Sequence, residues 1–146
     1  MTTAVLDTNV LVSGIVAFHR TTPPAQILKA WRAGEFQLVV SAHIIDELKS
    51  TLEKPYFARH ITPQQVAGTI TLFKEEAIVT PITTTIQGVA THPEDDLTLA
   101  TAVSAKADYL VTGDQPMLRK VGNTYQGVNL ITPIAFMEML YQSSKE

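Results

Sequence analysis

The fold is decided by the stretch from Ala4 to Ser13, which reads AVLDTNVLVS and begins as a buried apolar strand that ends in one carboxylate, Asp7. An ionised carboxylate beside so much apolar sequence is costly unless it is exposed, hydrogen-bonded or bound to a cation. One interpretation is a strand followed by a turn, in which Asp7 and Asn9 bond to local backbone. The other is a functional acid, and the rest of the chain has to decide between them.

The composition describes an ordered globular protein without thiol chemistry. The 146 residues are 45% hydrophobic and 17% charged, and they include no cysteine, which excludes disulfides, thiolate zinc sites and cysteine nucleophiles. The net charge of −3 predicts no broad basic surface, so a nucleic-acid partner would need a local basic patch or a bound metal. No apolar run approaches the roughly 18 residues of a membrane span and no signal-peptide pattern is present, so we expect a cytoplasmic protein.

Strand-like and helix-like segments alternate along the chain. After the first strand we expect helices at 25–33, 42–54, 63–76, 94–107, 116–121 and 133–142, and strands at 36–40, 77–82, 108–112 and 127–131. Such alternation predicts right-handed βα units and a parallel sheet covered by helices on both faces. The expected fold class is therefore α/β, a three-layer α/β/α sandwich around a mostly parallel five-stranded sheet. We expect one domain over residues 1–142 and a short C-terminal tail over 143–146.

Two carboxylates directly follow strands. Asp7 ends the run 4–6, and Asp114 follows the run 110–113. In an open parallel sheet, ligands bind beyond the carboxyl ends of the strands, so both side chains should reach the same edge. The alternative for Asp114 is a turn residue after Gly113.

Glu47 is the acid of the helix 42–54 that leans inward. It lies on the border of the apolar stripe, whereas Asp46 and Glu53 point further away. The helix follows its strand after almost no loop, so its first turns should lie near the edge that carries Asp7. The alternative for Glu47 is a solvated helix flank.

The acidic pair Asp95-Asp96 can be separated by the same reasoning. Asp96 precedes apolar residues by three, four and seven positions and therefore lies on the apolar stripe, while Asp95 is turned roughly 100° around the helix. Acids in a first turn usually complement the helix dipole, which is a sufficient role for Glu94 and Asp95. That role does not explain an acid at the core-facing position, so we expect Asp96 to be the functional one.

Four carboxylates at one crevice repel one another unless a cation neutralises them. Hard oxygen ligands, with no cysteine and no paired histidines, favour Mg²⁺ or Mn²⁺ over Zn²⁺ or Cu²⁺. Such ions orient and deprotonate a water and stabilise the charge on a phosphoryl group. The residues therefore predict phosphodiester hydrolysis.

Four motifs in this order and spacing resemble those of a PIN domain, the nuclease fold shared by toxins of the VapBC type and by RNA-processing enzymes. They are VLDTNVL at 5–11, IIDEL at 44–48, DDLTLATA at 95–102 and ADYLVTGD at 107–114. The last motif, with Leu118 after it, is most similar to the bacterial group of toxin components of toxin–antitoxin pairs, that is, VapC-like proteins.

The resemblance implies a metal-dependent endoribonuclease in which Asp7, Glu47, Asp96 and Asp114 hold one or two divalent ions, Mg²⁺ or Mn²⁺. The choice of Asp96 over Asp95 rests on the helical-face argument above.

The resemblance also implies supporting roles for three neighbours. Thr8 and Thr112 match positions where small hydroxyl residues support the acids or a water, and Asn9 matches a frequent polar neighbour. Basic residues that are candidates for phosphate contact are Arg20, Lys49, Lys54, Arg59, Arg119 and Lys120.

By the same resemblance, we expect an RNA substrate, a cognate antitoxin protein, and a homodimer or higher homo-oligomer. One alternative is a non-catalytic PIN module that binds RNA or a protein partner, which would bind RNA without turnover. Another is a phosphatase of the haloacid dehalogenase type, which is weakened because Asp7-Thr8-Asn9 lacks the second Asp of the Asp-x-Asp motif of that family.

Overall fold

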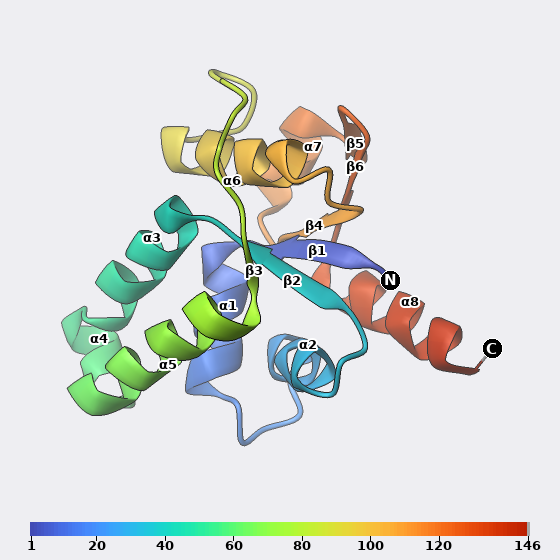
Figure 1. Cartoon of the computed structure of the whole chain (residues 1–146). Coiled ribbons are helices and arrows are strands. Elements are labelled where there is room, and N and C mark those ends of the chain that lie inside the picture. The colour runs from blue at the N-terminus through green and yellow to red at the C-terminus, as the bar shows by residue number, and fades with distance from the viewer. Residues whose placement is uncertain (146) are drawn as a thin grey trace.

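The computed structural model describes residues 1–145 and shows a sheet between two layers of helices (Figure 1). The strands of this part of the chain are β1 (Thr3–Leu6), β2 (Gln37–Val40), β3 (Ile78–Val79), β4 (Tyr109–Val111), β5 (Thr124–Tyr125) and β6 (Val128–Ile131). The helices are α1 (Thr8–Val16), α2 (Pro23–Arg32), α3 (Ala42–Leu52), α4 (Pro55–Ala58), α5 (Pro63–Glu76), α6 (Pro93–Ser104), α7 (Gln115–Val121) and α8 (Pro133–Lys145). The α/β sandwich expected from the sequence is confirmed.

The sheet has six strands in the order β3-β2-β1-β4-β6-β5, so β1 and β4 lie at its centre. Every neighbouring pair is parallel except β5 and β6. In Figure 1, α6 covers one face of the sheet, and α1, α2 and α8 lie on the other. With both faces covered, β1 has no solvent side, which is why Ala4, Val5 and Leu6 are all apolar and fully buried.

Helix α1 was not expected from the sequence. It begins at Thr8, directly after β1, although Val10 and Val12 are β-branched and lower the helix propensity. Burial outweighs that preference, because both valines enter the core. Gly14 permits the close approach of α2, since a Cβ atom at this position would lie 2.7 Å from the Leu28 side chain and from the Pro24 carbonyl oxygen.

Side chains cap the starts of two helices. Ser41 caps α3 by accepting a hydrogen bond from the Ile44 N–H at 3.4 Å, and its hydroxyl also lies 2.8 Å from the Thr101 hydroxyl of α6. Thr62 and Gln65 form a reciprocal capping box at the start of α5.

The structure also differs from the expected elements at short strands and helices and at the end of the last helix. The five-strand expectation missed β5, which pairs with β6 through a tight turn whose central residues, Gln126 and Gly127, have φ of 45° and 84°. It also missed the short helix α4, and β3 covers only two residues of the expected strand 77–82. Helix α8 continues to Lys145, so residues 143–145 are helical rather than a tail, and residue 146 lies outside the described part. In residues 1–145 no helix is long and apolar enough to cross a membrane.

Candidate functional site

Asp7 and Thr112 meet at the carboxyl ends of the two central strands. The parallel register places Leu6 beside Val111, and the Asp7 N–H donates to the Val111 carbonyl at 2.9 Å. The next residue of the neighbouring strand, Thr112, then donates from its hydroxyl to Asp7 Oδ2 at 2.8 Å. The contact expected between a small hydroxyl residue and this acid is therefore present.

Asp7 is a buried acid under electrostatic strain. Its side chain is only 6% exposed. Burial is the largest cause of a pKa raised above the usual value of 3.8, the hydrogen bond from Thr112 lowers it, and the negative charges of Glu47 and Asp114 raise it further. Asp7 also stands at the N-cap of α1 without using its side chain as a cap. The backbone of Thr8 also lowers the pKa of Asp7 by hydrogen bonding, so Thr112 and the adjacent backbone together hold the carboxylate at this edge.

Asp114 caps a helix, as expected of a turn residue, and also lies within electrostatic reach of Asp7. As the N-cap of α7, it accepts the Met117 N–H at Oδ1 (3.1 Å), which is the bond of a turn residue. Its own N–H donates to the Thr112 hydroxyl at 3.1 Å, so Thr112 joins it to Asp7. The charge of Asp114 raises the pKa of Asp7, which places the two carboxylates within electrostatic reach of each other.

Glu47 reaches the same edge from α3. Its charge raises the pKa of both Asp7 and Asp95, whereas Asp46 and Glu53 are exposed, as the helical spacing predicted. The ring of His43, one turn earlier, lies 3.7 Å from the Glu47 carboxylate and also contacts the Glu94 carbonyl at 3.2 Å. This pair lies between α3 and the start of α6.

Asp95 is the acid of α6 that joins the other three. Its pKa is raised to about 6, first by partial burial and then by nearby charges. The charges that act on it are Asp7, Asp114 and Glu47, which raise the pKa, and His92, which lowers it. The negative charges of these three acids therefore disfavour ionisation of the Asp95 carboxyl group.

Asp96 is buried, as the helical-face argument predicted, but it faces a loop. Its carboxylate accepts three backbone N–H groups, from Gly88, Val89 and Ala90, at 2.9, 3.1 and 2.7 Å. A core-facing acid must be satisfied by donors, and the preceding loop supplies them. The two acids of the pair therefore differ in environment: the charges of Asp7, Glu47 and Asp114 act on Asp95, whereas the carboxylate of Asp96 is bonded to the backbone of the preceding loop.

The two remaining neighbours of Asp7 differ in environment. Thr8 is buried, and within residues 1–145 its hydroxyl has no hydrogen-bond partner, which is uncommon for a buried polar atom. Asn9 is exposed on the first turn of α1, and no hydrogen bond of its side chain is found in the described part of the chain. Thr8 therefore offers a free oxygen beside Asp7.

The donor set fits a hard divalent cation in kind. Its groups are carboxylates, two of them with raised pKa values, and a buried hydroxyl without a partner lies beside them. As the side chains stand in residues 1–145, however, no three His, Asp or Glu groups converge closely enough to hold one ion. The residues are of the type that binds a divalent cation, but their side chains do not form a complete coordination sphere.

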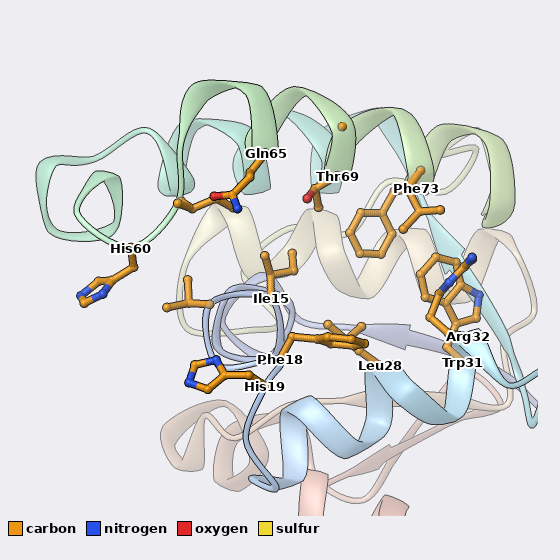
Figure 2. Close-up of a pocket in the computed structure, with 14 residues that line it drawn as sticks. Ile15, Phe18, His19, Leu28, Trp31, Arg32, His60, Gln65, Thr69 and Phe73 are labelled. Atoms are coloured by element: carbon orange, nitrogen blue, oxygen red, sulfur yellow. The ribbon is translucent and has the colours of Figure 1, made fainter.

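A separate pocket of about 650 Å³ lies on another side of the molecule (Figure 2). It lies between α5 and the segment formed by the end of α1 and α2, and none of its lining residues is an Asp or a Glu. Figure 2 shows Trp31 and Phe73 along it, with His19 and His60 at one end and Arg32 at the other. The acidic edge, that is, the end of the sheet at Asp7, Glu47, Asp95 and Asp114, contributes no residue to this pocket, so the two regions are distinct.

The comparisons with known proteins identify a family for this chain. Residues 3–116, most of the chain, match the PIN domain, and a search of curated proteins returned no match. PIN domains commonly have metal-dependent nuclease activity, usually use divalent metal ions and act on RNA or DNA. The matched range begins at β1 and ends just after Asp114, so it includes every acid of the edge described above. The chain therefore belongs to the PIN domain family.

Proposed function

We propose that this protein is a metal-dependent endoribonuclease, and that Asp7, Glu47, Asp95 and Asp114 hold its divalent ion, Mg²⁺ or Mn²⁺. The observation that carries the proposal is that Glu47 and Asp114 raise the pKa of Asp7, and that these three acids together raise the pKa of Asp95. Asp95 takes the place that the sequence suggested for Asp96, because both oxygens of Asp96 are already occupied by backbone N–H groups.

The bound ion would supply a water nucleophile at neutral pH and stabilise charge on the phosphoryl group. The chain itself holds and orients the acids. Thr112 donates to Asp7 and accepts from the Asp114 N–H, which fixes one carboxylate against the other. The backbone bond from Asp7 to Val111 anchors the first acid to the rigid centre of the sheet.

The six basic residues named from the sequence are exposed and could contact phosphates. Of these, Lys120 is held beside the loop that bonds to Asp96, since its ammonium donates to the Ala90 carbonyl at 2.8 Å. An ammonium has three donors, so two remain for a phosphate.

A cleavage assay with purified protein tests the proposal. Wild type should cut single-stranded RNA with Mn²⁺ or Mg²⁺ and lose that activity in EDTA. Asp7→Asn and Asp95→Asn should be inactive, while Asp46→Asn, an exposed acid beside Glu47, should retain wild-type activity. Equal cleavage by wild type, Asp7→Asn and Asp95→Asn would overturn the proposal.

The second candidate is a non-catalytic PIN module that binds RNA or a protein. The observation in its favour is that no three acids converge on one point in the described residues. This candidate predicts RNA binding that is independent of Mn²⁺ and produces no cleavage, so a binding titration with and without EDTA separates the two.

We further propose a toxin role in a toxin–antitoxin pair, with cytoplasmic RNA as target, an antitoxin protein as partner and a homodimer as the working form. The support is the resemblance of the motif at 107–114 to bacterial toxin components. Induced expression should arrest bacterial growth, and Asp7→Asn should not. Light scattering of the purified protein should give a mass of two chains, and a monomer would contradict the dimer.

A further inference from the structure

Asp96 is a buried acid that the proposed ligand set does not use. It is only 6% exposed, and both of its oxygens accept backbone N–H groups. Oδ2 accepts from Gly88, while Oδ1 accepts from both Val89 and Ala90. Gly88 has φ of +71°, a conformation that side chains disfavour, so the loop is shaped to turn its N–H groups towards one anion.

The same loop is held from a second helix. Lys120 of α7 donates to the carbonyl of Ala90 at 2.8 Å, while the N–H of Ala90 donates to Asp96 of α6. Both polar backbone groups of one residue are thus bonded to charged side chains of different helices. The segment 88–90 therefore links the first turn of α6 to α7.

These two helices carry two of the proposed ligands. Asp95 precedes Asp96 on the first turn of α6, and Asp114 is the N-cap of α7. The two carboxylates repel each other, so the ends of the helices that carry them must be held together by other contacts. The bonds of Asp96 and Lys120 to the segment 88–90 are such contacts.

We propose that Asp96 and Lys120 are positioning residues that, through the segment 88–90, fix Asp95 against Asp114 for binding of one divalent ion. This inference rests on the proposed metal-dependent nuclease function. It assigns to Asp96 an effect on metal affinity without any contact with the metal.

The principal variant is Asp96→Asn, which replaces one acceptor oxygen by an NH₂ group that cannot accept. Amide exchange at Gly88, Val89 and Ala90 should become faster, and calorimetry should show Mn²⁺ binding weakened by about 10–100-fold, the usual cost of losing a group that orients a ligand. Asp108→Asn is the matched control. Asp108 accepts the Thr3 N–H at 2.9 Å beside the start of β4, at the opposite end of that strand, so its loss should leave Mn²⁺ affinity unchanged.

Lys120 provides a second test that does not disturb the core, because its side chain is exposed. Lys120→Met should weaken Mn²⁺ binding in the absence of RNA, and Lys120→Arg should restore it, since a guanidinium can also donate to Ala90. The exposed Lys74→Met on α5 serves as control. A Lys120→Met variant that raises KM for RNA but keeps Mn²⁺ affinity would show a phosphate contact and overturn the positioning role of Lys120.

A double variant separates positioning from direct ligation. If Asp96 acts through Asp95, then Asp95→Asn with Asp96→Asn should bind Mn²⁺ no more weakly than Asp95→Asn alone. Two results would identify Asp96 as a ligand and overturn the inference. One is a double variant whose loss of Mn²⁺ affinity is the product of the two single losses, and the other is an Asp96→Asn variant that loses Mn²⁺ while the three amides stay protected.

The outcomes also distinguish this inference from the proposed function. Wild type that binds Mn²⁺ and cleaves RNA, with Asp96→Asn unchanged in both, would overturn the inference alone. Wild type that binds no Mn²⁺ and cleaves nothing would overturn the proposed function and the positioning role with it.

Discussion

The acidic edge and the apolar pocket differ in the environment that they give to their side chains. At the edge, burial and the charges of neighbouring acids raise the pKa values of Asp7 and Asp95. In the pocket, apolar side chains pack in the ordinary way, and the rings of Trp31 and Phe73 stack at 5.1 Å with 5° between their planes. The edge is arranged at a cost to stability, whereas the pocket lining adds to it.

The difference indicates which region is the better candidate for a catalytic site. A roomy pocket lined by apolar groups follows from imperfect packing between helices and requires no function. Repelling acids at the centre of a sheet lower the stability of the fold, and such strain is retained at functional sites. Substitutions at the edge should therefore change nuclease activity more than substitutions in the pocket.

Asp7→Asn should have the largest effect. It removes the acid at the centre of the proposed ligand set, and the cleavage rate should fall by about 10²–10³-fold or more, as when a key electrostatic group is lost. Because the ionised carboxylate is disfavoured by burial and by two acids, the metal-free variant should be at least as stable as wild type at pH 7. Cleavage rates and urea midpoints measure the two effects. A variant that is both less stable and fully active would remove the contrast between the two regions.

Thr112→Val should have the next largest effect. Valine keeps the shape of threonine but removes the 2.8 Å hydrogen bond to Asp7 and the acceptor for the Asp114 N–H, so activity should fall by about 10–100-fold. Thr98→Val is the matched control, because the buried Thr98 hydroxyl donates only to the Glu94 carbonyl of its own helix. Similar activity in the two variants would show that Thr112 has no special role.

The pH dependence of stability should reveal the strain at Asp95. Its pKa is raised from 3.8 to about 6 by folding, so the folded state binds the proton more tightly than the unfolded state. Stability of the metal-free protein should therefore fall as the pH rises through this interval, and the loss should be complete above it.

Asp95→Asn removes the part of the pH dependence of stability that Asp95 causes. The difference in Tm between the variant and wild type therefore separates the effect of Asp95 from that of other titrating groups. Because solvent screens a partly buried group, Asp95 should change the free energy of unfolding by about 1 kcal/mol or less. The Tm of the variant relative to that of wild type should therefore rise by about 2 °C between pH 4 and pH 7. Added Mn²⁺ should raise the Tm of wild type only. A difference that does not change with pH would argue against a coupled acid at this position.

Phe73→Leu should have the smallest effect on activity. Phe73 is 2% exposed and stacks on Trp31 in the pocket lining, so the substitution should lower the free energy of unfolding by about 1–2 kcal/mol. The rate of RNA cleavage per folded molecule should not change. A clear loss of activity at temperatures where the variant is folded would connect the pocket to the acidic edge.

The alternation of strands and helices and the burial of individual acids could be predicted from the sequence, although α1, α4 and β5 were missed. Alternating periodicities predicted the βα units, and the position of Asp7 and Asp114 after apolar strands predicted the edge they share. Helical spacing predicted that Glu47 leans inward while Asp46 and Glu53 are exposed. These predictions succeeded because each depends on residues that are close in the sequence.

Local strand and helix periods thus specify the α/β fold and an apolar β1 that ends in an acid. The environments of Asp95 and Asp96, by contrast, depend on the tertiary structure. Periodicity correctly predicted that Asp96 is buried, but it could not show that three N–H groups of the segment 88–90 lie there to receive it. Helix α1 was decided in the same way, because burial between the sheet and α2 outweighed the local preference of its valines.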